Sequence, residues 1–223
     1  MKRAAKSQPS PNSDASCHLI KGTSLAMATI HPQRSRYHYG SNRQLGHGKV
    51  VHSPFPTVTA AFYHFASSCP ENKAIRDLSG PPREMTYGDL ASRVQHLARR
   101  LRRRGVTPGQ RIPLIVKRSL EMIVGIWAIL SCGAQYVPLD GGVVPDETIR
   151  RVLDQAQGNV VLCLSSTKHR MTAFNSDHTV VTVDEPESLN TETVPENGYM
   201  DLATPDGGCY VIYTSGGSYM MRS

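Results

Sequence analysis

Cysteine, aromatic residues and long hydrophobic runs are all scarce in this 223-residue sequence. The five cysteines are odd in number and no two form a C-x-x-C pair, which argues against a zinc site and against a thioredoxin-like motif. The longest apolar stretch, residues 122–132, is about half of the ~20 residues that a membrane span requires. We therefore expect free thiols, a reducing cytoplasmic location and no membrane partner.

Acidic residues are almost absent from residues 1–53, which contain eight Lys or Arg and Asp14 as their one acid. The remaining residues hold 17 basic and 17 acidic side chains, so the formal charge of +7 belongs to the N-terminal segment. That segment has no helical or strand period and too little apolar area to offset its ordering entropy. We expect residues 1–53 to be a disordered basic tail. Such tails are more often solvated extensions than nucleic-acid sites, so nucleic acid is not the expected partner.

Histidine is frequent, but its spacing does not predict a metal site. Five of the nine histidines lie within residues 1–53. The other four have neither an i, i+4 pair nor any other coordinating spacing: His64, His96, His169 and His178. The arginine-rich run at residues 99–104 is interpreted as the solvated face and last turn of a helix, where cations complement the helix dipole.

Helical and strand patterns alternate from residue 54 onward. Helices are expected from Val58 to a point before Pro70, from a Thr86 cap to Gly105, over residues 120–132, and from Pro145 to Gly158. Strands are expected at residues 74–78, 111–117, 135–139, 160–164, 179–183 and 209–213, with Pro113 indicating an edge or a bulge in the second. Residues 185–206 are polar and are expected to be a long surface connection. The alternation predicts an α/β fold with a parallel-rich sheet and flanking helices.

The stretch at residues 209–218, CYVIYTSGGS, joins a hydrophobic strand pattern to a Thr/Ser/Gly loop. Such a loop offers backbone amides and hydroxyls to phosphate oxygens, and loops that follow parallel strands often bind ligands. It is no Walker loop, because no G-K-[ST] follows, and Tyr213 replaces the first glycine of a nucleophile elbow. From its residues alone, such a loop is more often an ordinary turn than a phosphate-binding loop. Asp140, at the end of another strand, is interpreted as a turn cap.

Three segments in order carry a family resemblance: MTYGDL at 85–90, LSCGAQYVPLD at 130–140 and GCYVIYTSG at 208–216. They resemble the first three core motifs of the adenylate-forming (AMP-binding) superfamily. The resemblance is closest to the adenylation domains of fungal nonribosomal peptide synthetases and covers roughly residues 55–217. It implies that residues 54–223 are the N-terminal part of the family's large domain.

The resemblance implies ATP-dependent activation of an amino acid or another carboxylic acid as an acyl-adenylate, in nonribosomal peptide or other secondary-metabolite biosynthesis. ATP and Mg²⁺ are the implied cofactors, and the phosphopantetheine arm of a carrier protein is the implied acceptor. The family's phosphate loop matches Thr214, Ser215, Gly216, Gly217 and Ser218, the last two replacing Ser/Thr positions. The family then continues with glycine, proline, lysine and glycine, whereas this sequence has residues 219–223, YMMRS.

A full adenylation domain is more than twice this length, and its substrate pocket and catalytic lysine lie downstream of the third motif. We therefore expect a truncated domain that is inactive alone, with no catalytic residue of its own. Whether the chain is itself an enzyme stays open at this point. The alternative is a non-catalytic binding or interaction module, which would require residues 54–223 to be soluble and to unfold cooperatively.

Overall fold

The structure, a computed structural model, describes residues 53–78, 80–156, 158–174, 177–185 and 198–213. Contacts divide the chain into residues 1–30 and residues 31–223, and every described residue belongs to the second unit. Apart from Ser53, the basic segment of residues 1–53 lies outside the described residues, so its disorder stays a prediction.

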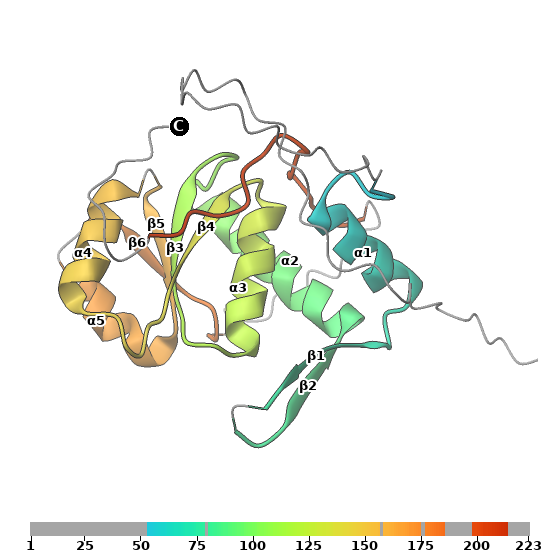
Figure 1. The fold of residues 1–223 in the computed structure, drawn as a ribbon, viewed down its shortest axis with the longest axis horizontal. Coiled ribbons are helices and arrows are strands. Elements are labelled where there is room, and N and C mark those ends of the chain that lie inside the picture. The colour runs from blue at the N-terminus through green and yellow to red at the C-terminus, as the bar shows by residue number, and fades with distance from the viewer. Residues whose placement is uncertain (1–52, 79, 157, 175–176, 186–197, 214–223) are drawn as a thin grey trace, which may run out of the picture. The chain divides into compact units, whose positions relative to one another are not determined.

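A four-stranded parallel sheet forms the centre of the described part of the chain (Figure 1). Its strands are β3 (Arg111–Ile115), β4 (Gln135–Leu139), β5 (Val160–Cys163) and β6 (Thr179–Thr182), in the order β4-β3-β5-β6. All neighbouring pairs are parallel, so the carboxyl ends of the four strands share one edge. The predicted α/β fold with a parallel-rich sheet is confirmed.

Helices cover both faces of this sheet (Figure 1). One face carries α2 (Tyr87–Arg103) and α3 (Leu120–Ser131), and α1 (Val58–Ser68) packs on these two helices. The other face carries α4 (Asp146–Gln155) and α5 (Lys168–Thr172). A 3₁₀ turn at Ser165–Thr167 immediately precedes α5. Successive residues of β3 therefore enter different cores. Leu114 packs on the side of α2 and α3, and Ile115 packs on the side of α4 and α5. Burial on both faces explains why this strand is a continuous apolar run.

Three helices begin at a hydroxyl side chain that caps the first turn. The capping hydroxyls of Thr57, Thr86 and Ser119 accept the backbone N–H three residues on, at 3.0, 3.2 and 3.4 Å. The predicted Thr86 cap is confirmed, and Gly105 follows the end of α2 with a φ of 87°. None of the helices in the described residues combines the length and the apolar composition that crossing a bilayer requires.

The buried face of α1 differs from the predicted apolar stripe. Phe62 is buried as expected, but Val58 is 46% exposed, while Tyr63 lies in the core at 6% exposure. A tyrosine is buried this deeply when its hydroxyl finds a partner. Here the Tyr63 hydroxyl forms a 2.6 Å hydrogen bond with the Ser131 hydroxyl of α3, a long-range contact that helical periodicity does not reveal.

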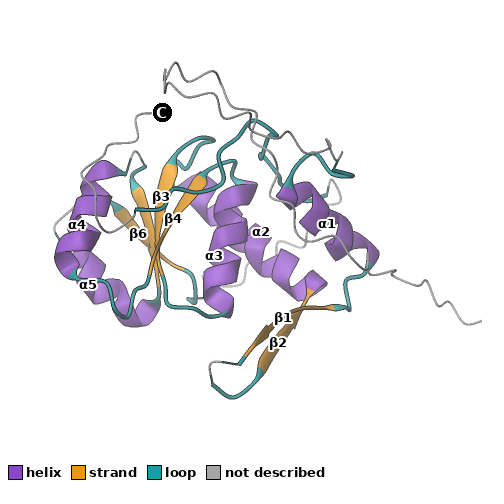
Figure 2. Cartoon of the chain, in the orientation of Figure 1, coloured by secondary structure: helices purple, strands orange, loops and turns teal. Residues whose placement is uncertain are grey.

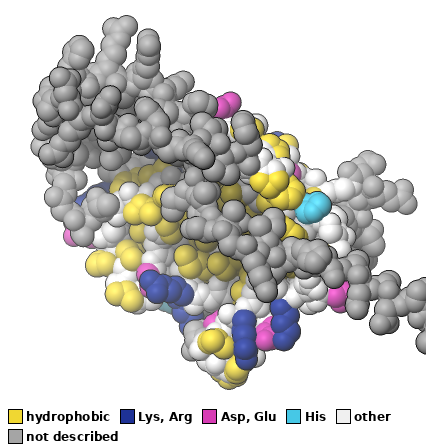
Figure 3. All heavy atoms as spheres, turned by 45° about the vertical axis from the view of Figure 1, so that its right-hand side comes forward, with side chains coloured by type: hydrophobic (Ala, Val, Ile, Leu, Met, Phe, Trp, Pro, Cys, Tyr) yellow, Lys and Arg dark blue, Asp and Glu magenta, His cyan; other side chains and the backbone are white. Residues whose placement is uncertain are grey.

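An antiparallel hairpin precedes α2 and lies apart from the parallel sheet (Figure 2). It pairs β1 (Lys73–Asp77) with β2 (Arg83–Thr86). Only the first of these two strands was predicted from the sequence. Basic and acidic side chains mix on its surface (Figure 3), in ion pairs such as Lys73 with Glu84 at 2.6 Å. Arg83 bonds Asp77 at 2.9 Å and reaches Glu121 of α3 at 2.8 Å. Burial opposes ionisation of Glu121, yet the hydrogen bonds from Arg83 hold its pKa below the usual value.

β3 lies inside the sheet, which corrects the expectation that Pro113 marks an edge or a bulge. The carbonyl of Gln110 and the N–H of Val116 both bond to residues of β4, so even-numbered residues of β3 direct their backbone groups toward β4. The nitrogen of Pro113 therefore faces β5, and pairing with β5 begins only at Leu114. Although Pro113 has no N–H, no hydrogen bond to β4 is lost, and its position lies just before the residues of β3 that pair with β5.

Residues 209–213 do not form the buried strand that the sequence predicts. One bridge joins Tyr210 to Tyr136 of β4, and the segment is a loop beside β4 in Figure 2. Its large side chains are exposed, by 61% at Ile212 and 40% at Tyr213. A hydrophobic sequence is buried only where a neighbour covers it, and among the described residues no strand pairs with the outer side of this segment.

We predict that Gly133→Ala destabilises the fold more than Gly105→Ala. Both glycines have positive φ, 68° and 87°, so either replacement costs about 1 kcal/mol in backbone strain. A Cβ at Gly133 would also lie 2.6 Å from the carbonyl oxygen of Leu202, whereas a Cβ at Gly105 meets nothing within 4 Å. Urea titration should show losses of unfolding free energy of about 2–4 kcal/mol and about 1 kcal/mol, respectively. Equal losses would contradict the close approach of Leu202.

Candidate functional site

The carboxyl ends of parallel strands form the edge at which α/β sheets usually bind ligands. Polar residues follow all four strands here: Lys117 comes after β3, Asp140 after β4, Ser165 after β5, and Asp184 after β6. The partners of these side chains determine which part of the edge can receive a ligand. A polar group already bonded to the protein contributes to a turn, whereas an open one can bind substrate.

The segment of residues 209–213 leads to this edge along β4. Tyr136 of β4 donates its N–H to the carbonyl of Cys209 at 3.1 Å and accepts the N–H of Val211 at 3.0 Å. Two residues that flank one partner in this way are the unit of a parallel ladder. The segment therefore runs in the same direction as β4, toward the carboxyl end of the sheet.

The predicted phosphate-binding residues, Thr214, Ser215, Gly216, Gly217 and Ser218, lie outside the described residues. The structure places the segment that precedes them and the strand beside which it runs. Their contacts with phosphate stay a prediction.

The turn after β4 is held in one conformation by its own residues and by α5. Asp140 accepts the N–H of Gly142 on its Oδ1 at 3.0 Å, so its interpretation as a turn cap is confirmed. Arg170 of α5 donates to the carbonyls of Gly141 and Val144 at 2.8 and 3.0 Å. A Cβ at Gly141 would lie 2.8 Å from the carbonyl oxygen of Ile115, so only glycine fits this close approach to β3. The turn therefore has a fixed conformation at the carboxyl end of β4.

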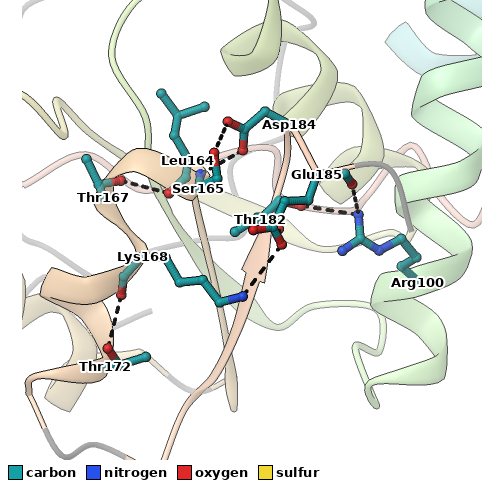
Figure 4. Close-up of polar contacts among 9 residues, drawn as sticks. All are labelled: Arg100, Leu164, Ser165, Thr167, Lys168, Thr172, Thr182, Asp184 and Glu185. Carbon is teal, nitrogen blue, oxygen red and sulfur yellow. Dashed lines mark hydrogen bonds and ion pairs between the residues drawn. The ribbon is translucent and has the colours of Figure 1, made fainter. Parts of the chain in front are cut away.

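A second group of polar residues joins the ends of β5 and β6 (Figure 4). Asp184 accepts the backbone N–H of Ser165 at 2.7 Å and its hydroxyl at 2.6 Å. Glu185 accepts the Thr182 hydroxyl at 2.6 Å and lies 3.5 Å from the Lys168 ammonium group. The hydrogen bond from Thr182, together with Lys168, holds the pKa of Glu185 below its usual value.

This second group has the chemistry of a structural cap. The Ser165 hydroxyl donates to a carboxylate, so it is not poised against an imidazole base as a nucleophilic serine is. Arg100 of α2 donates to the carbonyls of Thr182 and Glu185 at 3.2 and 3.3 Å, which ties the end of β6 to the helix. The arginine-rich run was interpreted as solvated, and Arg100 instead has this packing role.

The described residues contain no group of three or more His, Cys, Asp or Glu side chains that could hold a metal ion.

Three thiols differ sharply in their surroundings. Cys132 and Cys163 are buried, and burial raises the pKa of Cys132 to about 12 and that of Cys163 to about 11. Cys209 is exposed, because nothing among the described residues covers the outer side of its segment. Cys209, with its exposed thiol, thus precedes the predicted loop in the sequence.

One buried polar residue with a structural role was not predicted from the sequence. Gln95 lies on the apolar face of α2 at 1% exposure and hydrogen-bonds the backbone of Met200. Residues 185–206 were expected to be a surface connection, yet their described part, residues 198–206, includes this anchored residue. The available signal was a glutamine within an otherwise apolar helical stripe, between Val94 and Leu97.

The sequence pattern of the family described as AMP-binding enzyme matches residues 62–217. Adenylate-forming reductase 06235 of Coprinopsis cinerea is 32% identical over 175 residues, and tyrocidine synthase 2 of Brevibacillus parabrevis is 34% identical over 160 residues. These alignments include 78% and 72% of this chain but only 16% and 4% of the relatives. The chain thus spans about a sixth or less of the length of these relatives.

A solved structure has the same arrangement of helices and strands. It is the nonribosomal peptide synthetase FmoA3 in a form bound to α-methyl-L-serine-AMP, with a TM-score of 0.60 and 27% sequence identity. The superposition includes 74% of this chain and 18% of that one. The match of the sequence pattern ends at Gly217, inside the Thr/Ser/Gly loop.

We predict that iodoacetamide at about pH 8 modifies Cys209 in the native chain and leaves Cys132 and Cys163 unmodified. Thiolate is the reactive species, and the two buried thiols are both inaccessible and protonated at that pH. Peptide mass spectrometry measures the modification at each site, and the same reaction in urea, where all thiols react, is the control. Rapid modification of Cys163 in the native chain would contradict the burial of β5.

Proposed function

The chain belongs to the AMP-binding enzyme family, and from this premise we propose that residues 54–217 form the N-terminal portion of an adenylation domain. In this proposal the domain uses ATP to convert an amino acid or another carboxylic acid into an acyl-adenylate. The observation that supports it is the parallel pairing of residues 209–211 with Tyr136, which directs the chain toward the carboxyl edge of the sheet just before the Thr/Ser/Gly sequence begins.

The proposed work of the loop is to bind the β- and γ-phosphates of ATP. The hydroxyls of Thr214 and Ser215 donate to phosphate oxygens, and Gly216 and Gly217 allow the backbone amides to approach closely. The substrate carboxylate attacks the α-phosphorus, the bond to the bridging oxygen breaks, and pyrophosphate leaves. Donors fixed on the leaving phosphates stabilise the charge that develops there. Mg²⁺ would arrive on the nucleotide phosphates and would neutralise part of their charge.

The proposed acceptor of the acyl group is the phosphopantetheine thiol of a carrier protein, in nonribosomal peptide or related secondary-metabolite biosynthesis. Support comes from similarity to tyrocidine synthase 2 and to FmoA3. The similarity to an adenylate-forming reductase is compatible with the same first step. We place this chemistry in the cytoplasm, because Cys132 and Cys163 are free thiols.

A hybrid chain tests this function directly. Residues 54–217 replace the corresponding part of an adenylation domain of tyrocidine synthase 2, and substrate-dependent exchange of pyrophosphate into ATP is measured. We predict detectable exchange, which Thr214→Ala and Ser215→Ala each lower by about 10- to 100-fold through loss of a hydroxyl on phosphate.

Ser165→Ala is the matched control in the same hybrid, because it also removes one hydroxyl from the carboxyl edge but from the group that is bonded to Asp184. Its exchange rate should stay within about twofold of the parent hybrid. A large loss in this control, with none in Thr214→Ala and Ser215→Ala, would move the site to the ends of β5 and β6 and would overturn the proposed role of the loop.

We further predict that residues 1–223 alone catalyse negligible pyrophosphate exchange. The family resemblance assigns the substrate pocket and the catalytic lysine to sequence that these 223 residues do not contain. Purified chain is incubated with Mg²⁺, ATP, labelled pyrophosphate and a mixture of amino acids. Robust exchange above a no-substrate blank would contradict the prediction. A sharp cooperative melt without exchange would favour the non-catalytic binding module.

A further inference from the structure

Gln95 uses both ends of its amide group on the backbone of one residue. Its Nε2 donates to the carbonyl of Met200 at 2.9 Å, and its Oε1 accepts the N–H of Met200 at 2.9 Å. An amide supplies a donor and an acceptor side by side at the end of one side chain, whereas leucine offers neither and an ionised carboxylate offers only acceptors. The contact is the side-chain equivalent of one rung of a sheet.

Two neighbours complete the attachment of this segment. The ring of Tyr199 stacks on Tyr63 with 4.5 Å between centroids and 18° between planes. Leu202 donates its N–H to the carbonyl of Ser131 at 2.9 Å. Because Gln95 Nε2 and the Ser131 hydroxyl both bond the Tyr63 hydroxyl, helices α1, α2 and α3 act on the segment through one connected network. We call Tyr63, Gln95 and Ser131, where they hold residues 199–202, the Gln95 clamp.

The described chain runs without a gap from this clamp to the edge of β4. The carbonyl oxygen of Leu202 would lie 2.6 Å from a Cβ added at Gly133, and the Nε2 atom of Gln135 would lie 2.7 Å from a Cβ added at Gly208. Pairing with β4 at residues 209–211 then follows. The clamp thus sets the point from which the chain reaches β4.

The attachment to β4 is too small to position the segment alone. Among the described residues it consists of two backbone hydrogen bonds at Tyr136, each worth about 1 kcal/mol net, and one tilted ring contact between Tyr136 and Tyr210 with 5.8 Å between centroids. The side chains of Tyr210, Ile212 and Tyr213 stay 46%, 61% and 40% exposed, so they are only partly packed. A segment held by so few contacts opens frequently unless a second attachment limits its freedom.

We propose that Gln95 is a positioning residue for the nucleotide site. By fixing residues 199–202 it orders residues 209–213 beside β4, and through them it sets where the phosphate loop begins. The functional part of this inference rests on the proposed function, because Gln95 itself touches no reacting group.

The test compares Gln95→Met with Tyr63→Phe in the 223-residue chain. Both variants remove buried polar atoms from the same network, but only Gln95→Met removes the two bonds to Met200, and Tyr63→Phe keeps the ring that stacks on Tyr199. Hydrogen–deuterium exchange is followed at the amides of Leu202 and Val211. We expect exchange about tenfold faster in Gln95→Met than in Tyr63→Phe, at comparable melting temperatures.

Unchanged exchange at Val211 in Gln95→Met would overturn the inference, as would equal acceleration in the two variants, since a general loss of stability affects both alike. Gln95→Asn serves if Gln95→Met does not fold. Its amide is one methylene shorter and cannot span the same atoms, so an intermediate acceleration at Val211 supports the clamp and wild-type exchange there refutes it.

Adding Mg²⁺ and ATP separates this inference from the function on which it rests. Slower exchange at residues 209–213 with nucleotide in the wild-type chain, weakened about tenfold in apparent affinity by Gln95→Met, supports both. If nucleotide changes nothing in the wild-type chain while Gln95→Met still accelerates exchange at Val211, the proposed function fails for this chain and the ordering of the segment by Gln95 stands.

Discussion

Parallel strand pairing is the constraint on which the rest of the structure depends. It places every carboxyl end at one edge, and it requires helices on both faces, because each connection crosses the sheet. β3 and β5 are accordingly apolar on both sides, with Leu114 and Leu162 in one core and Ile115 and Val161 in the other. Helices thus cover both faces of the sheet, and its polar carboxyl edge is the part that can bind a ligand.

Polar residues at that edge fall into two kinds. Those after β5 and β6 are bonded to the protein itself, as Asp184 is to Ser165 and Glu185 to Thr182, and they hold strand ends together. Those after β4 form a turn fixed by Asp140 and Arg170 beside the path of residues 209–213. A ligand-binding loop needs such a rigid neighbour, because donors that are already in place lose little entropy when the ligand arrives.

Local features of the sequence were enough to predict most of the fold, and long-range contacts account for the rest. The Thr86 cap, the end of α2 before Gly105 and the strands of the sheet follow from residues close together in the chain. Pro113 misled because strand order, which sets the direction in which its nitrogen points, is a tertiary property. Residues 209–213 were wrongly predicted to form a strand, because an apolar pattern does not show which neighbour, if any, covers the segment. The motif located the candidate loop, whereas the role of Gln95 depends on Met200, which lies 105 residues away.

The distance between clamp and loop has a physical use. A phosphate loop must admit ATP and release pyrophosphate, so tight packing of the loop itself would slow both steps. In the proposed function, fixing the chain at residues 199–202 instead limits where the loop begins and keeps the backbone amides of the loop available to phosphate oxygens. Two hydrogen bonds to Tyr136 then suffice to align residues 209–213 with β4, because the entropy of bringing that segment to the sheet has already been met at Gln95. The firm attachment of residues 199–202 at Gln95 therefore allows residues 209–213 to be held beside β4 by few contacts.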